Sequence, residues 1–204
     1  MKRIVLMALL ALALPLSALA TDVDFSNTGG TLSGNSAGLS LTGSNLTGVT
    51  GLGTGACSTA APCGSVSFTT GALASGDTTN GAVFSSGGTF TITGNGTAGL
   101  PAGAIFTGSF SGPVTWTPLG TIGVDGTIFY TLSGRVSGTY YNGTTVSGAT
   151  VQITFNTGTG GFQGSVGLGS GNTVITTVPE PGTLGLLGTG LVGLAGIVRR
   201  KLKA

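Results

Sequence analysis

The sequence predicts an antiparallel all-β domain, a β-sandwich or roll, and three observations support that fold class. In several short runs, apolar or aromatic residues alternate with polar ones, which is the two-residue period of a half-buried strand. Clusters of Gly, Asn, Ser and Pro separate these runs at short spacing. No stretch between Thr21 and Val178 repeats its apolar residues with the 3.6-residue period of an amphipathic helix.

The clearest strand runs from Thr127 to Tyr141, where the even positions are apolar or glycine and Phe129 is the one slip in the alternation. Asn142-Gly143 follows and predicts a hairpin, because a type I′ turn needs positive φ at both central residues. A two-residue loop then sets a register that pairs apolar residues on one face. The expected pairs are Leu132 with Ile153, Tyr130 with Phe155, Val136 with Ala149, and Gly134 with Val151.

Shorter runs with the same alternation predict further strands. These runs are Ser65–Thr69, Thr89–Thr93, Ala104–Ser111, Val114–Thr117 and Thr173–Thr177. The segment Thr31–Leu52 differs, because its leucines are spaced irregularly among Gly, Ser and Thr. Units of Leu, Ser or Thr followed by Gly recur loosely, which makes a β-solenoid the alternative architecture, although no fixed period of 20 or more residues is visible.

Residues 1–20 predict a secretory signal peptide, whose apolar part would be a short helix. Lys2-Arg3 precede the apolar run Ile4–Leu14, and Ala18-Leu19-Ala20 supplies an A-x-A cleavage pattern. We expect signal peptidase to cut after Ala20. The exported body is then the Gly/Ser/Thr-rich all-β domain 21–176, which begins at Thr21.

The segment 177–204 combines three features of a sorting tail. Val178-Pro179-Glu180-Pro181 is held extended by its prolines. The uncharged run Gly182–Val198 would span roughly 25 Å as a helix, which is short but usable for a bilayer core of about 30 Å. A basic stop that stays on the cytoplasmic side follows, formed by Arg199, Arg200, Lys201 and Lys203. A permanent membrane anchor with an accidental Pro-Glu-Pro is the alternative.

The tail resembles the PEP-CTERM tag of exosortase substrates through Pro179-Glu180-Pro181, the glycine-punctuated apolar run and Arg199-Arg200. The resemblance is confined to about residues 178–204. It implies that exosortase, an integral-membrane protease, processes the chain in a Gram-negative bacterium that also makes extracellular polysaccharide. It further implies transient anchoring in the inner membrane by the C-terminal helix, then a place at the cell surface or in the extracellular matrix of a biofilm. It implies no particular fold or activity for the body.

The body is nearly uncharged, which excludes several function classes. Arg135 is its only basic residue against four aspartates, so its net charge is −3 and nucleic acid is excluded as a partner. It contains no His and no Lys, which excludes Ser-His-Asp and Ser-Lys catalysis and His-ligated metals. Asp77 and Asp125 have turn-forming neighbours, and Asp22-x-Asp24 lacks the loop of a calcium site. We expect no catalytic residue, no metal and no cofactor.

Cys57 and Cys63 are the only cysteines. In an oxidising compartment a pair at this spacing predicts one local disulfide. Closing so small a loop stabilises the fold by roughly 2 kcal/mol in the chain-entropy model.

Two functions are therefore expected for the exported body. The first is a structural or interaction role at the cell surface or in the biofilm matrix, without catalysis. The second is a carbohydrate-binding module that holds extracellular polysaccharide on exposed aromatic side chains. Core or cross-strand packing is the favoured interpretation of Trp116, Tyr130, Tyr140 and Tyr141. A solvent-exposed, coplanar row that includes Trp116 and Tyr141 would favour binding, whereas burial of both would remove that case.

Overall fold

The computed structural model describes residues 21–52, 57–120, 128–156 and 161–177. The predicted signal peptide with Ala18 and Ala20, and the predicted sorting tail, lie outside these ranges. Within the described part, no helix is long and apolar enough to cross a membrane. Residues Asp22–Thr177 form one compact unit by their own contacts.

The described residues form twelve strands and no helix. The strands are β1 (Thr21–Thr28), β2 (Thr31–Asn35), β3 (Gly38–Thr50), β4 (Gly64–Thr69), β5 (Leu73–Asp77), β6 (Gly81–Phe84), β7 (Gly87–Asn95), β8 (Ala102–Leu119), β9 (Phe129–Tyr140), β10 (Thr145–Asn156), β11 (Ser165–Gly167) and β12 (Gly171–Thr177). The prediction of an antiparallel all-β domain is confirmed.

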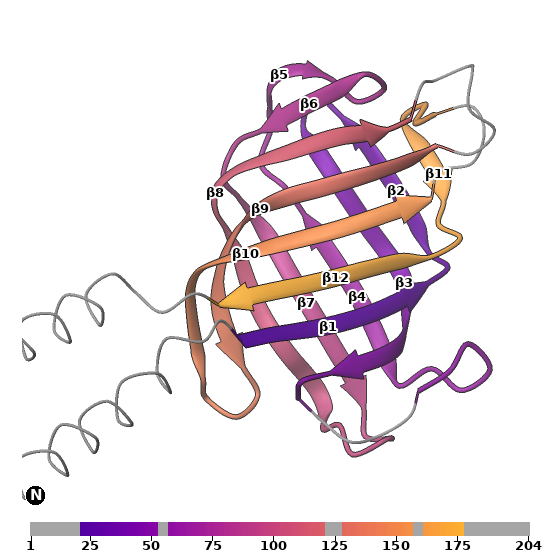
Figure 1. Ribbon diagram of the computed structural model, residues 1–204, viewed down its shortest axis with the longest axis vertical. Coiled ribbons are helices and arrows are strands. Elements are labelled where there is room, and N and C mark those ends of the chain that lie inside the picture. Colours follow the sequence, from indigo (N-terminus) through magenta and orange to yellow (C-terminus); the bar gives the residue numbers. More distant parts are fainter. Residues whose placement is uncertain (1–20, 53–56, 121–127, 157–160, 178–204) are drawn as a thin grey trace, which may run out of the picture. The chain divides into compact units, whose positions relative to one another are not determined.

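The sheet closes on itself into a barrel of eight strands in the order β1-β12-β10-β9-β8-β7-β4-β3, because β3 also pairs with β1. Figure 1 shows β8, β9, β10, β12 and β1 crossing in front of β7, β4, β3 and β2. The expected sandwich or roll is therefore wrong, and so is the solenoid alternative. The reason is physical: closure joins the first and last strands of the body, a pairing that local alternation does not encode.

Contacts between β1 and β12 indicate their register. The Ser26 hydroxyl donates to Asn172 Oδ1 at 3.4 Å, and a Cβ on Gly171 would lie 2.8 Å from the amide of Asn27. Continuing this antiparallel register places Asp22 opposite Thr176. The chain therefore enters and leaves the barrel at the same rim.

The predicted hairpin between β9 and β10 is confirmed, but its loop differs from the prediction. Gly143 donates to the carbonyl of Tyr140 at 2.9 Å, and of the loop residues only Gly143 has positive φ, so the loop has three residues instead of two. This loop shifts the register by one. A β-bulge at Ser147 and Gly148 shifts it back, with both residues facing Ser137 of β9.

Beyond the bulge the four expected pairs are all present, with Ala149, Val151, Ile153 and Phe155 opposite their predicted partners. β4, β7 and β12 match predicted strands closely. The two strands expected at Ala104–Ser111 and Val114–Thr117 are one strand, β8, whose register shifts between Phe110 and Val114. The sequence reading missed β1, β5, β6 and β11 and left β2 and β3 unresolved inside Thr31–Leu52.

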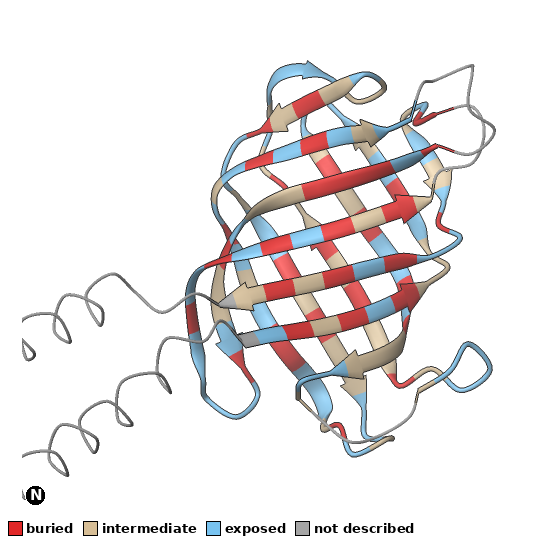
Figure 2. Cartoon of the chain, in the orientation of Figure 1, coloured by how far each residue is buried: buried red, intermediate tan, exposed pale blue. Residues whose placement is uncertain are grey.

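Aromatic side chains fill the barrel interior. Figure 2 shows buried residues alternating with exposed or intermediate ones along the strands, as a closed sheet requires. The interior of an eight-stranded barrel is just wide enough to be filled by side chains alone. The largest buried side chains are Trp116, Tyr130, Phe25, Phe68, Phe84, Phe90, Phe106, Phe110, Phe155 and Phe162.

Glycines on the interior face make room for these rings. Gly108 and Gly138 are cross-strand partners on β8 and β9. A Cβ on Gly138 would lie 2.7 Å from Phe106 Cζ and 2.4 Å from the carbonyl oxygen of Thr107. The Phe106 ring therefore occupies space that any larger residue at these positions would need, so glycine here is a packing requirement.

We predict that Gly138→Ala destabilises the barrel by about 1–3 kcal/mol, because the added methyl overpacks the core against fixed backbone. Gly167→Ala is the matched control, since a Cβ there meets nothing within 4 Å. Equilibrium unfolding in urea measures both variants. Equal stability of Gly138→Ala and Gly167→Ala would contradict the packing account.

The turn between β5 and β6 is tied to the aromatic core at one end of the barrel (Figure 1). Trp116 and Tyr130 stack with their ring centroids 4.5 Å apart. The Trp116 indole donates to the carbonyl of Thr78 at 2.8 Å, and the Tyr130 hydroxyl donates to that of Thr79 at 2.7 Å. The same hydroxyl accepts from the backbone N–H of Phe162 at 2.9 Å. Two buried rings thus hold the turn and the segment around Phe162 together.

We predict that Tyr130→Phe destabilises the protein by about 1–3 kcal/mol, because it leaves the Phe162 N–H and the Thr79 carbonyl without their partner. Tyr141→Phe removes the same atom from a side chain that is 47% exposed, and it serves as the control. Thermal unfolding followed by near-UV circular dichroism compares them. A Tyr130→Phe protein as stable as the control would show that this hydroxyl does not hold the turn.

Candidate binding groove

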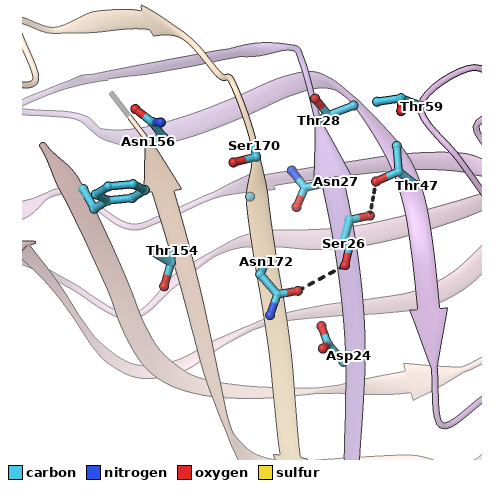
Figure 3. Close-up of a pocket in the computed structure, with 12 residues that line it drawn as sticks. Asp24, Ser26, Asn27, Thr28, Thr47, Thr59, Thr154, Asn156, Ser170 and Asn172 are labelled. Carbon is cyan, nitrogen blue, oxygen red and sulfur yellow. Dashed lines mark hydrogen bonds between the residues drawn. The ribbon is translucent and has the colours of Figure 1, made fainter. Parts of the chain in front are cut away.

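A polar groove of about 520 Å³ lies along the outer face of β1, β12 and β10. Its lining combines hydroxyl, amide and carboxylate side chains with one aromatic ring. The lining residues are Asp24, Ser26, Asn27, Thr28, Thr47, Thr59, Phe129, Thr154, Asn156, Ser170, Gly171 and Asn172. Figure 3 shows the β1 and β12 side chains facing one another across the seam where the barrel closes.

Strand alternation explains which side chains face the groove. On β1, Val23 and Phe25 are buried in the barrel, so Asp24 and Ser26 point outward. The same alternation turns Asn172 of β12 outward. The lining on β10, Thr154 and Asn156, flanks the buried Phe155 in the same way.

Hydrogen bonds hold part of this surface in place. Besides the bond from Ser26 to Asn172, Thr47 of β3 donates to the backbone carbonyl of Ser26 at 3.2 Å (Figure 3). Thr28 donates to the carbonyl of Gly169 at 2.6 Å, which joins the end of β1 to the turn before β12. The lining of the groove comes from β1, β3, β9, β10 and β12, and the part at the seam exists only in the closed barrel.

Two acceptor atoms of the lining are buried and accept no hydrogen bond from any described residue. They are Asp24 Oδ1 and Asn27 Oδ1. Asn27 is only 2% exposed, and its Nδ2 donates to the Ser44 hydroxyl at 2.6 Å, which orients the amide. Glycine at 171 leaves space for this amide between β1 and β12. Asn27 shares the inward face of β1 with Val23 and Phe25, so its oxygen lies inside the barrel wall. Buried acceptors in native proteins nearly always have donors, so Asp24 Oδ1 marks a place on the outer face where a donor is needed.

Phe129 supplies the aromatic part of the groove. It is 40% exposed and lies beside Leu119 of β8 and Asn156 of β10 in the sheet. The sequence reading treated it only as a slip in the alternation of its strand. Because Phe129 is out of phase with the buried residues of its strand, that slip could have predicted an aromatic side chain on the outer face.

The aromatic side chains considered from the sequence do not form an exposed row. Trp116, Tyr130 and Tyr140 are buried, and burial raises the pKa of Tyr140 to about 12. Tyr141 is exposed, but it lies at the β9–β10 turn without Trp116 beside it. Packing in the core, which the sequence favoured, is thus confirmed for Trp116, Tyr130 and Tyr140, and a sugar-stacking row of Trp116 and Tyr141 is absent.

Asp77 is a turn residue, as the sequence indicated. Its Oδ1 accepts from the backbone N–H groups of Thr79 and Asn80 at 2.9 and 2.7 Å. The Asn80 backbone bond, followed by its side-chain bond, lowers the pKa of this carboxyl below its usual value. Asp125 lies outside the described residues, and the described part of the chain holds no cluster of three or more metal-ligating His, Cys, Asp or Glu residues.

The predicted disulfide between Cys57 and Cys63 is confirmed, with Cα atoms 5.6 Å apart. Cys63 is buried, and its backbone bonds Leu46 of β3 and Asn95 of β7. The small loop that the disulfide closes carries Thr59, which lines the groove. The disulfide therefore limits the movement of one wall of the site.

Comparison with known proteins bears on the tail. Residues 177–201 match the model of the PEP-CTERM protein-sorting motif. The chain carries a PEP-CTERM motif. This confirms the resemblance drawn from Pro179-Glu180-Pro181 and the residues after it, and the PEP-CTERM motif indicates an exported, exosortase-processed protein of the Gram-negative envelope or cell surface. No curated protein and no solved structure matches the chain.

Proposed function

We propose that this protein is a non-catalytic, structural or interaction component of the cell surface or biofilm matrix, released from the inner membrane by exosortase. The observation that carries this proposal is the PEP-CTERM motif at 177–201, next to a barrel whose last strand ends at Thr177. Signal peptidase removes residues 1–20, and the C-terminal helix anchors the precursor until processing.

The fold supports this order of events. β1 begins at Thr21, the residue after the predicted signal-peptidase site, and β12 ends before the Pro-Glu-Pro segment. Both proposed cuts therefore spare every strand of the barrel. Because Asp22 and Thr176 lie opposite one another in the extrapolated register, the first strand of the barrel begins and its last strand ends at one rim.

We predict that the mature protein begins at Thr21 and lacks Arg199 and Arg200. Mass spectrometry of the protein from cells with and without exosortase measures both ends. Cells without exosortase should retain the basic tail in the membrane fraction, whereas loss of signal-peptidase processing should change only the N-terminus. An intact Arg199-Arg200 tail on the mature protein from wild-type cells would contradict processing.

A second candidate function is binding of extracellular polysaccharide. The groove favours it: an open surface lined by hydroxyl, amide and carboxylate side chains, with one exposed ring and an Asp24 oxygen that lacks a donor, is suited to a ligand rich in hydroxyl groups. The two functions are compatible, since a matrix protein that binds the matrix polymer is retained in it.

A further inference from the structure

We propose that the β1–β12–β10 groove binds a neutral polysaccharide, with Phe129 stacked on one sugar ring and the carboxylate of Asp24 accepting from a sugar hydroxyl. This proposal rests on the second candidate function and assigns it a site. It uses residues that were not among the aromatic residues considered from the sequence.

An acceptor without a donor is the first observation behind this proposal. Leaving a buried polar atom without a partner is unfavourable, and more so for a charged group. Asp24 Oδ1 is in this state on the β1 side of the groove, on a side chain that strand alternation turns outward. A ligand that brings a hydroxyl donor to Asp24 removes this penalty.

The exposed ring of Phe129 is the second observation behind this proposal. Phe129 borders the groove from the side opposite β1, with β10 and β12 between them in the sheet. Four adjacent strands span three interstrand spacings, roughly 14 Å, which is enough for a short run of linked sugars. A sugar ring has an apolar face for Phe129 and hydroxyl groups at its edge for the polar wall. Binding sites with these properties commonly join aromatic contact to a few fixed polar groups.

Charge selects the class of polysaccharide. Asp24 is the only charged residue of the lining, and no basic residue is among the lining residues. An acidic polymer would bring its carboxylates beside Asp24 without a cation to pair them, so like charges would repel. The groove therefore favours a neutral polymer over an acidic one.

A calcium ion is the competing occupant, because it also needs oxygen ligands. Calcium takes six to eight oxygens, usually with several carboxylates. The groove supplies one carboxylate, and Asn172 Oδ1 already accepts from Ser26. Phe129 contributes no ligand to a metal, whereas it contributes directly to a sugar. The polysaccharide accounts for more of the lining.

Affinity electrophoresis and calorimetry on the processed protein, purified from the exporting cells, test the site. The probes are the neutral and acidic fractions of the polysaccharide that these cells release, dextran and alginate as neutral and acidic standards, and CaCl₂ alone. We expect binding to the neutral fraction and at least tenfold weaker binding to the acidic fraction and to alginate. Phe129→Ala and Asp24→Ala should each weaken binding to the neutral fraction at least tenfold, with unchanged circular dichroism.

Tyr141→Ala is the control, since it removes an exposed aromatic ring that does not line the groove. Neutral binding that survives both groove variants, or that Tyr141→Ala abolishes instead, overturns the site while polysaccharide binding stands. No binding to either neutral probe overturns the second candidate function and the site together, while the processing proposal stands on its own measurement. Calcium binding that Asp24→Ala removes, without glycan binding, assigns the groove to a metal and overturns the proposal.

Discussion

The structure depends on the pairing of β1 at both of its edges. β1 neighbours β12 on one side, and its residues Asp24–Thr28 pair with β3 on the other, which turns an open sheet into a barrel. Without it, β12 and β3 would each present a free edge, which is a template for pairing with other chains. Closure also brings Asp24 and Ser26 beside Asn172, so the seam of the barrel and the candidate groove are the same place.

Closure also explains the unusual composition. Only 6% of the residues are charged, so the two faces of each strand are distinguished by aromatic and aliphatic side chains inside and by Ser, Thr, Asn and Gly outside. Inside, the rings need space, and glycines such as Gly108 and Gly138 provide it. Outside, hydroxyls and amides form a surface whose interactions depend little on ionic strength, because few charges are there to be screened. Such a surface is suited to a hydrated polymer matrix.

Local patterns predicted the strands where alternation was strong. They could not predict contacts between residues far apart in the sequence, such as those that close the barrel. The β9–β10 register was correct from Ala149 onward, but only because the bulge at Ser147 and Gly148 cancels the longer loop. Closure was missed because β1 and β12, the first and last strands of the body, are neighbours only in space. The groove was missed for the same reason, and Phe129 was visible only as a break in a pattern. Trp116 and Tyr130 were expected to prefer the core, and they do.

The antiparallel seam links sorting to the proposed binding site. Because β1 runs away from the rim where the chain enters and β12 returns to it, residues farther along β1 lie farther from both connections. The groove reaches from Asp24, two residues along β1 from Asp22, to Thr28, whose hydroxyl donates to the carbonyl of Gly169. Strand residues rise about 3.4 Å each, so four residues separate these levels by roughly 14 Å. Every strand that lines the groove belongs to the barrel, so closure of the barrel, and not the sorting segments, sets the arrangement of the lining.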